Sequence, residues 1–190
     1  VGHAQSLSRV LAAELRLYEL KRDQTMTVKG AATLTANILS GRPHYVQLLI
    51  VGVDDSGPSV YSIDSAGGSI PDVYCATGSG SPFMYGGLED QYKSGMSRDE
   101  ALALAAKSLL ASAQRDAASG NGMDLAYITL EAGFSLLSEE EVIELLFGQQ
   151  GGRIVKRPPA LAGPVKADRQ HPDDRLLVHV LRPCLLTEPE

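Results

Sequence analysis

Side chains that could do chemistry together gather in two short stretches of this sequence. In "GSGS", residues 78–81, Ser79 carries a hydroxyl between two glycines. In "RDAASG", residues 115–120, Asp116 and Ser119 lie three positions apart. A carboxylate and hydroxyls brought together can surround a reactive atom and hold it, as an activated nucleophile requires. Each stretch by itself also fits a plain turn or the end of a helix.

Other familiar catalytic and cofactor motifs do not occur. A dinucleotide fingerprint would need a third glycine where Phe83 stands, and the Gly-Lys-Ser/Thr of a Walker loop is absent. Backbone N–H groups after Gly80 could still point at an anion, so a nucleotide-binding α/β module stays open as an alternative. There is no GxSxG elbow. The four histidines lack metal-ligand spacing, so neither a metal nor another cofactor is expected.

The composition describes an ordinary globular chain in which 44% of the 190 residues are hydrophobic and 21% are charged. A net charge of −6 disfavours nucleic acid or an anionic membrane as the partner. The longest apolar run, at 46–53, is too short to span a bilayer. Two cysteines are too few for a disulfide framework, so we expect a reducing, cytoplasmic location.

Hydrophobic periodicity predicts an α+β chain that must position these polar residues. Capping boxes at Ser97–Glu100 and Ser138–Glu141 each mark the start of a helix. Short turns between the central strands indicate antiparallel pairing. The predicted helices span about 4–21, 28–41, 82–93, 97–118 and 138–147, and the predicted strands span 45–54, 59–64 and 69–77, with two more within 123–137.

The periodicity also predicts which faces are buried. The first helix should bury one apolar face, and the second should use small residues for close packing against a neighbour. The strand at 45–54 is nearly all apolar, so it should be buried on both sides. The residues of the first helix's predicted face are Leu7, Val10, Leu11, Leu17 and Tyr18.

Residues 1–147 are predicted to form one domain and residues 148–190 a Pro-rich flexible tail. Residues 151–190 contain six of the ten prolines. Such a composition disfavours a packed core. Within this tail, "RLLVHVLR" could form an isolated strand.

Taken together, the motifs resemble the β subunit family of the archaeal proteasome core particle. The segments that carry the resemblance are, in chain order, "AQSLSRVLAAELRLYEL", "YSID", "ATGSGSPFMYGGLE" and "QRDAASGNGMDLAYIT". The resemblance covers about residues 1–147. It implies an N-terminal nucleophile hydrolase fold, which is a four-layer αββα sandwich of antiparallel sheets. It also implies threonine-type endopeptidase activity on unfolded polypeptides.

The resemblance further implies a role for each polar residue. The family's nucleophile is the side-chain oxygen of an N-terminal threonine, whose α-amino group handles the proton together with a lysine. Ser79, Asp116 and Ser119 match the residues that hold this amine. Asp64, in "YSID", matches an aspartate that reaches toward the substrate pocket of the adjacent subunit. The hydroxyl oxygens of Ser79 and Ser119 are therefore expected no more than roughly 6 Å apart, with Asp116 facing the same spot.

In that family the nucleophile lies upstream of the first helix. Here the sequence starts at Val1, only a few residues before the first predicted helix. We therefore expect the N-terminal strands and the threonine to be missing from this chain, and the chain alone to be inactive. The implied partners are other β subunits in a homo-oligomeric ring, the α-subunit ring, a regulatory ATPase acting indirectly and unfolded polypeptide, with no nucleic acid and no membrane. A non-catalytic structural ring subunit is the alternative.

Overall fold

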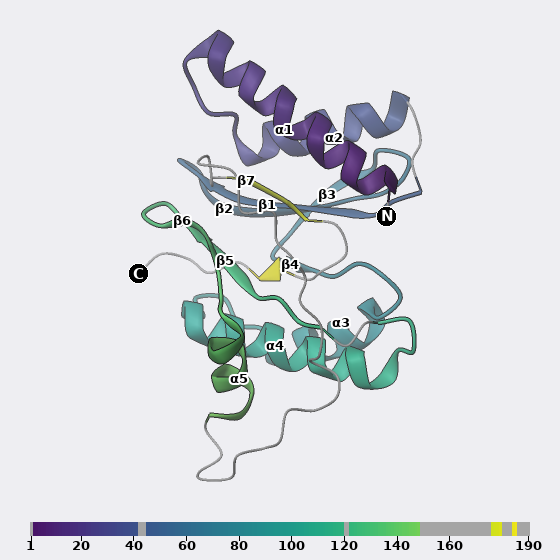
Figure 1. Cartoon of the computed structure of the whole chain (residues 1–190), viewed down its shortest axis with the longest axis vertical. Helices are drawn as coiled ribbons and strands as arrows, with labels where there is room; N and C mark the ends of the chain where they lie inside the picture. The colour runs from purple at the N-terminus through teal and green to yellow at the C-terminus, as the bar shows by residue number, and fades with distance from the viewer. Residues whose placement is uncertain (1, 42–44, 120–121, 149–175, 180–183, 186–190) are drawn as a thin grey trace.

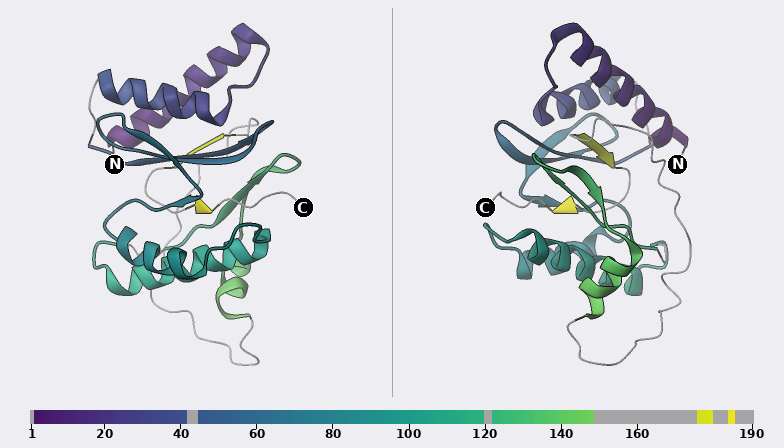
Figure 2. Two further views of the ribbon diagram at one scale, coloured as in Figure 1. Left: turned by 180° about the vertical axis from the view of Figure 1, so that it is seen from behind. Right: turned by 60° about the vertical axis from the view of Figure 1, so that its left-hand side comes forward.

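Strands occupy the middle of the molecule, and helices cover both sides (Figure 1). The computed structural model describes residues 2–41, 45–119, 122–148, 176–179 and 184–185. Helices α1 and α2 lie on one side of the strands, and α3, α4 and α5 lie on the other (Figures 1 and 2). The strand pairs are antiparallel. The predicted α+β class with antiparallel sheets is confirmed.

Up to Phe147 the elements follow the predicted order, although some of their boundaries differ. The predicted strand 69–77 is divided at Val73, whose N–H donates to the side chain of Asp72 and so leaves the ladder. The predicted helix 97–118 ends at Arg115. In chain order the elements are α1 (Gly2–Arg22), α2 (Val28–Gly41), β1 (Leu48–Asp54), β2 (Gly57–Ile63), β3 (Ser69–Asp72), β4 (Tyr74–Cys75), α3 (Ser81–Gln91), α4 (Arg98–Arg115), β5 (Ala126–Thr129), β6 (Gly133–Leu136), α5 (Glu139–Phe147), β7 (Leu176–His179) and β8 (Cys184–Leu185).

Both predicted capping boxes are formed. The Ser97 hydroxyl accepts from the N–H of Glu100, and the Glu100 carboxylate accepts from the N–H of Ser97. Ser138 and Glu141 make the same reciprocal pair at the start of α5. Each box satisfies two N–H groups that would otherwise have no partner within the helix, which fixes where α4 and α5 begin.

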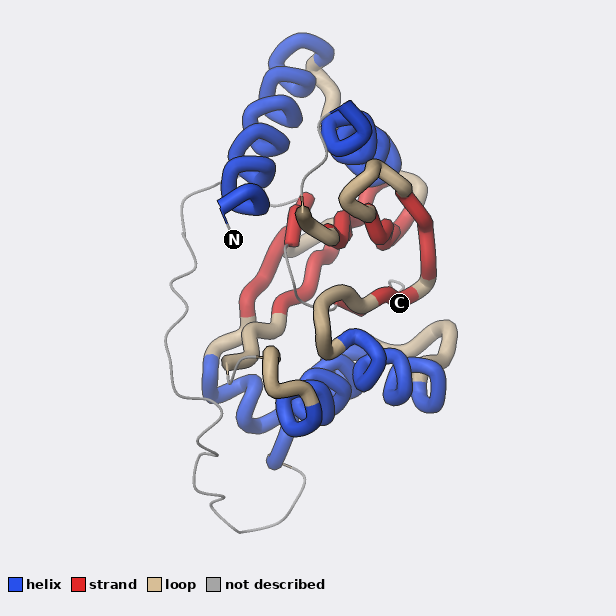
Figure 3. The backbone as a smooth tube through the Cα atoms, turned by 90° about the vertical axis from the view of Figure 1, so that its right-hand side faces the viewer, coloured by secondary structure: helices blue, strands red, loops and turns tan. Residues whose placement is uncertain are grey.

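Strand β1 is a buried inner strand of the four-stranded sheet, whose order is β3-β2-β1-β7. Because successive side chains point to opposite faces, Leu48 and Ile50 pack in the core beneath α1 and α2. Leu49 and Val51 pack on the other face, in a cluster with Cys75 of β4 and Ile128 of β5. Figure 3 shows these strands between two helical layers. The prediction that this strand is buried on both sides is confirmed.

The α2 helix packs its small side chains Ala31, Ala32 and Ala36 into the core above the sheet, as predicted. The predicted apolar face of α1 is only partly right. Leu7 and Leu11 are buried, whereas Val10 and Leu17 are 45% and 42% exposed. The 100° step between helical residues places these two on an adjoining stripe, which turns away from α2 and the sheet.

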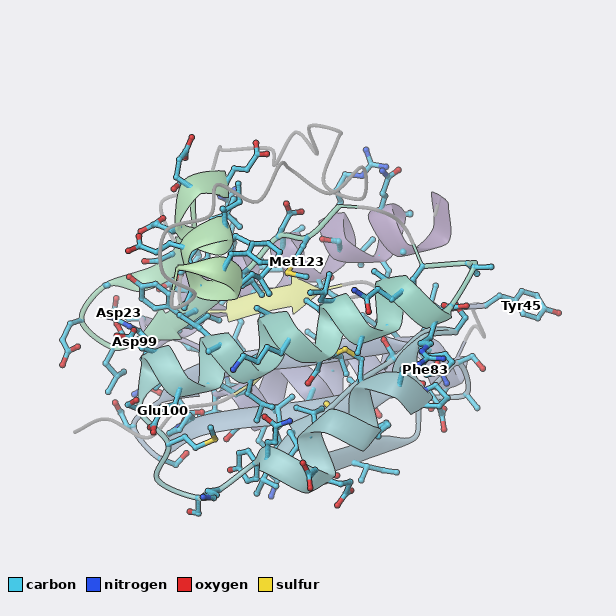
Figure 4. All side chains as sticks on the ribbon, turned by 90° about the horizontal axis from the view of Figure 1, so that it is seen from below. Asp23, Tyr45, Phe83, Asp99, Glu100 and Met123 are labelled. Carbon is cyan, nitrogen blue, oxygen red and sulfur yellow. The ribbon has the colours of Figure 1, made fainter. Side chains whose placement is uncertain are left out.

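The antiparallel arrangement of α3 and α4 decides which ends meet. Figure 4 labels Phe83 at the start of α3 and Asp99 and Glu100 at the start of α4, and these lie at opposite ends of the helix pair. The start of α3 therefore lies beside the end of α4. The two helices approach closely at Gly87, where an added Cβ would lie only 2.6 Å from Oγ of Ser108.

Two short segments of the predicted tail pair with the domain through their backbones. Leu176–His179, within the segment singled out as a possible strand, forms β7 beside β1, and Cys184–Leu185 forms β8 beside β4. Most of the predicted tail lies outside the described residues. The division of the chain at 147/148 stays a prediction.

Asp54 at the end of β1 fixes the start of α2 on the sheet. Its carboxylate accepts from the N–H of Val28 at 2.8 Å. Although burial raises the pKa of Asp54, hydrogen bonds from Ser56 and from Val28 lower it on balance. We expect Asp54→Ala to lower the free energy of unfolding by about 1 kcal/mol, as loss of a helix cap does. Urea denaturation measures this difference. Asp55→Ala, at the neighbouring exposed carboxylate, is the control and should change the free energy of unfolding little.

Candidate active site

The end of α4 is shaped by Asp116, which is the C-cap of the helix in an extended conformation. Its N–H donates to the carbonyl of Ser112 at 2.8 Å and closes the last helical turn. Its Oδ1 accepts from the N–H of Ala118 at 3.1 Å. This side-chain turn competes with continuation of the helix, so α4 ends before the predicted residue 118.

The "GSGS" loop brings Ser79 to this corner. Gly78 has φ of +95°, which only glycine adopts without strain, and its carbonyl accepts from the N–H of Ser81 at 3.1 Å. Gly80 then begins α3 as its N-cap residue and is buried. Because α3 starts beside the end of α4, the turn directs Ser79 toward Asp116.

The two predicted serines converge on a single atom. Oγ of Ser79 donates to Oδ2 of Asp116 at 2.6 Å, and Oγ of Ser119 donates to the same oxygen at 2.7 Å. The hydroxyl oxygens therefore lie within the roughly 6 Å that was predicted, although the residues are 40 positions apart in the sequence. Both hydroxyls bond to the carboxylate here, whereas the resemblance has them face an amine.

These bonds leave the cluster able to accept but not to donate. A serine hydroxyl has one proton, and Ser79 and Ser119 both direct theirs to Asp116. Each hydroxyl still has a lone pair available, beside a negatively charged carboxylate. A third group that bonds there must therefore bring N–H or O–H donors, and an amine or ammonium group is complementary to this site.

The hydrogen bonds also set the protonation of Asp116. The Ser79 hydroxyl first, then the Ser119 hydroxyl and the Ala118 N–H, hold the pKa of this carboxyl below its usual value. A carboxyl whose pKa is lower in the folded state stabilises the fold above its unfolded pKa of about 3.9. That contribution is lost as the pH falls through the lower, folded value.

We therefore expect the stability difference between the wild-type chain and Asp116→Asn to shrink as the pH is lowered from 7 to about 3. Urea denaturation of both chains across this range measures it. A difference that stays constant with pH would contradict the ionised, hydrogen-bonded state of Asp116.

Ser112 belongs to the same cluster and was missed from the sequence. Its Oγ donates to the carbonyl of Gly80 at 3.2 Å and lies 3.3 Å from Oγ of Ser119. Its side chain is buried, with 4% exposure. The available signal was its spacing: Ser112 follows the apolar Leu109 by three positions in the predicted helix 97–118 and so lies on the same side of that helix, where a polar residue needs a partner.

Asp64 lies on a separate turn, between β2 and β3. Its Oδ1 accepts from the N–H groups of Ala66 and Gly68, each at 2.8 Å, and the Gly68 N–H is the main cause of its lowered pKa. Gly67 has φ of +89° and lies so close to α2 that a Cβ would overlap Ser40. The described contacts of Asp64 are thus those of an exposed, turn-forming carboxylate.

The start of α3 offers little to a phosphate. The N–H of Ser81 donates to Gly78, and those of Phe83 and Met84 donate to Gly80. Pro82 has no N–H. The donors that the nucleotide-binding alternative requires are therefore already used in this first turn.

Among the described residues, no three His, Cys, Asp or Glu side chains are grouped to hold a metal ion. None of the described helices is long and apolar enough to cross a membrane.

Comparison with known proteins matches this chain to one family. The family described as "Proteasome subunit" matches residues 1–128. The chain is 49% identical over 146 residues to the proteasome subunit beta of Methanosarcina thermophila, covering 75% of this chain and 69% of that protein. For the proteasome subunit beta of Methanobrevibacter smithii the identity is 44% over 146 residues, covering 77% and 71%.

The proteasome subunit beta of Picrophilus torridus is 46% identical over 149 residues, covering 77% of this chain and 70% of the relative. The matched family region contains Asp64, Ser79, Asp116 and Ser119. The chain therefore belongs to the proteasome subunit family, and the relatives named here are β subunits.

Proposed function

We propose that this chain is a β subunit of the proteasome core particle and that it contributes to threonine-type cleavage of peptide bonds in unfolded polypeptides. The observation that carries the proposal is the convergence of Ser79 and Ser119 on one oxygen of Asp116. A site that can only accept hydrogen bonds is suited to hold the α-amino group of an N-terminal threonine. Holding that amine places the base beside the hydroxyl that attacks the substrate carbonyl.

In this mechanism the amine takes the threonine hydroxyl proton as the hydroxyl oxygen attacks, and the developing ammonium is stabilised by the nearby carboxylate of Asp116. Ser79 and Ser119 accept N–H bonds from the amine and keep their own protons on Asp116, so the orientation of the amine is fixed from three directions. The threonine would be supplied from upstream of the first helix, as in the family the chain resembles.

The arrangement of helices and strands supports the four-layer αββα sandwich of the N-terminal nucleophile hydrolases. In the assembly we propose, the chain joins other β subunits in a homo-oligomeric ring that stacks on an α-subunit ring, with a regulatory ATPase delivering unfolded polypeptide in the cytoplasm. Asp64, exposed on its turn, is available to the substrate pocket of an adjacent subunit.

A chimera tests the proposal. The part of the Methanosarcina thermophila β subunit that lies upstream of the matched region, cut so that it begins with a threonine, is joined before Val1, and the product is assembled with α subunits. We expect cleavage of a fluorogenic peptide that is blocked by a threonine-directed inhibitor. The 190-residue chain assayed alone should show none.

Replacing the grafted threonine with alanine is the matched control and should abolish cleavage. Rings that assemble but do not cleave, although the same segment on its own subunit is active, would overturn the enzymatic proposal. They would favour the non-catalytic structural subunit.

A further inference from the structure

Ser112 contacts both segments that form the candidate active site, although it belongs to neither. It lies inside α4, one turn before the helix ends. From there its Oγ reaches the carbonyl of Gly80, next to Ser79, at 3.2 Å, and lies 3.3 Å from Oγ of Ser119. Because its side chain is only 4% exposed, it cannot itself meet a substrate or an incoming amine.

The direction of the Ser112–Ser119 contact follows from the protons. Ser119 uses its proton on Asp116 at 2.7 Å, which is the shorter of its two contacts. Ser112 is therefore the donor, and its one proton is shared between the Gly80 carbonyl and Oγ of Ser119. A hydroxyl that accepts one bond while donating another is held in one rotamer and is polarised along the chain of bonds.

The Ser112 side chain packs directly against the backbone of Gly80. A Cβ on Gly80 would lie 1.9 Å from Oγ of Ser112 and 2.7 Å from Oγ of Ser119. The two hydroxyls thus rest directly on the glycine backbone. This close packing contact fixes the distance between the "GSGS" loop and α4.

We propose that Ser112 is a positioning residue of this site, which holds Ser119 toward Asp116 and holds the Ser79–Gly80 backbone against α4. Its effect on peptide cleavage rests on the function proposed above, whereas its effect on the Asp116 cluster does not. The proposal therefore has two readouts that can fail separately.

The first readout is the titration of Asp116 in the 190-residue chain, followed by carboxyl NMR. Ser112→Ala should raise the pKa of Asp116 in the same direction as Ser119→Ala, because Ser119 is no longer held in its bonding rotamer. Ser108→Ala is the matched control. Ser108 is 3% exposed, lies one turn earlier on α4 and packs against Gly87, and no hydrogen bond joins its side chain to the cluster among the described residues. It should leave the titration unchanged.

The second readout uses the active chimera. Ser112→Ala should lower kcat about fivefold, as loss of one hydrogen bond does, with KM unchanged. Ser108→Ala should leave both constants unchanged. An unchanged Asp116 titration in Ser112→Ala would overturn the proposal, as would equal shifts in Ser112→Ala and Ser108→Ala, which would indicate helix packing alone. An inactive chimera would contradict the proposed function, and the titration would still decide the role of Ser112.

Discussion

Asp116→Asn is expected to lower kcat for peptide cleavage by about a hundredfold in rings of the active chimera. Oδ2 of Asp116 accepts two hydroxyl protons, from Ser79 and Ser119. An asparagine amide group in its place is a donor, so it would face two other donors. If the amide is turned round, it faces the N–H of Ala118, which donates to Oδ1. In either orientation the cluster loses bonds, and the negative charge beside the amine is gone.

The rate is measured with a fluorogenic peptide at saturating concentration, on rings whose assembly is verified by size. Asp90→Asn is the control, because Asp90 is an exposed carboxylate on α3 and should leave kcat unchanged. Full activity of Asp116→Asn in intact rings would remove the cluster from the proposed mechanism. Equal losses in both variants would point to a general charge effect.

Gly80→Ala is expected to lower the free energy of unfolding of the 190-residue chain by about 2 kcal/mol, a typical cost of overpacking. The added Cβ would lie 1.9 Å from Oγ of Ser112 and 2.7 Å from Oγ of Ser119. Relief requires one of these hydroxyls, or the backbone of α3, to move. Either movement breaks hydrogen bonds of the cluster.

Gly86→Ala provides a matched control on the same helix. A Cβ on Gly86 would meet nothing within 4 Å. This substitution should raise stability by about 0.5–1 kcal/mol, because alanine favours a helix interior over glycine. Urea denaturation of both variants checks the contrast. If the two alanines have the same effect on stability, the close contact of Gly80 with α4 does not exist in solution.

Coupling between Gly80 and Ser112 offers a finer check on the same contact. The double variant Gly80→Ala, Ser112→Ala should lose less free energy of unfolding than the two single variants lose together. The nearest obstacle to the new Cβ, Oγ of Ser112, is then absent. Simple additivity would locate the strain elsewhere.

The sequence by itself determined the local elements of this protein. The capping boxes at Ser97 and Ser138 are encoded within four residues, and the structure forms both. The continuous apolar run of β1 likewise required burial on both faces. These predictions succeed because each depends on residues close in the chain, whose geometry a helix or strand sets directly.

The residues of the candidate site could be named from the sequence, but the site could be assembled only by the tertiary structure. Ser79 and Ser119 are 40 positions apart, and they meet at Asp116 because α3 begins beside the end of α4. Periodicity gives no information on that approach. It depends on Gly80 and Gly87 leaving room for two serines of the facing helix.

The same limit explains the other differences. The periodicity of α1 marks apolar residues but not which of them a neighbour covers, so Val10 and Leu17 are exposed. The spacing of Ser112 marks it as a polar residue on an apolar face, but only packing supplies its partners at Gly80 and Ser119. Burial is a property of surfaces in contact, and the contact between α3 and α4 exists only once the chain has folded.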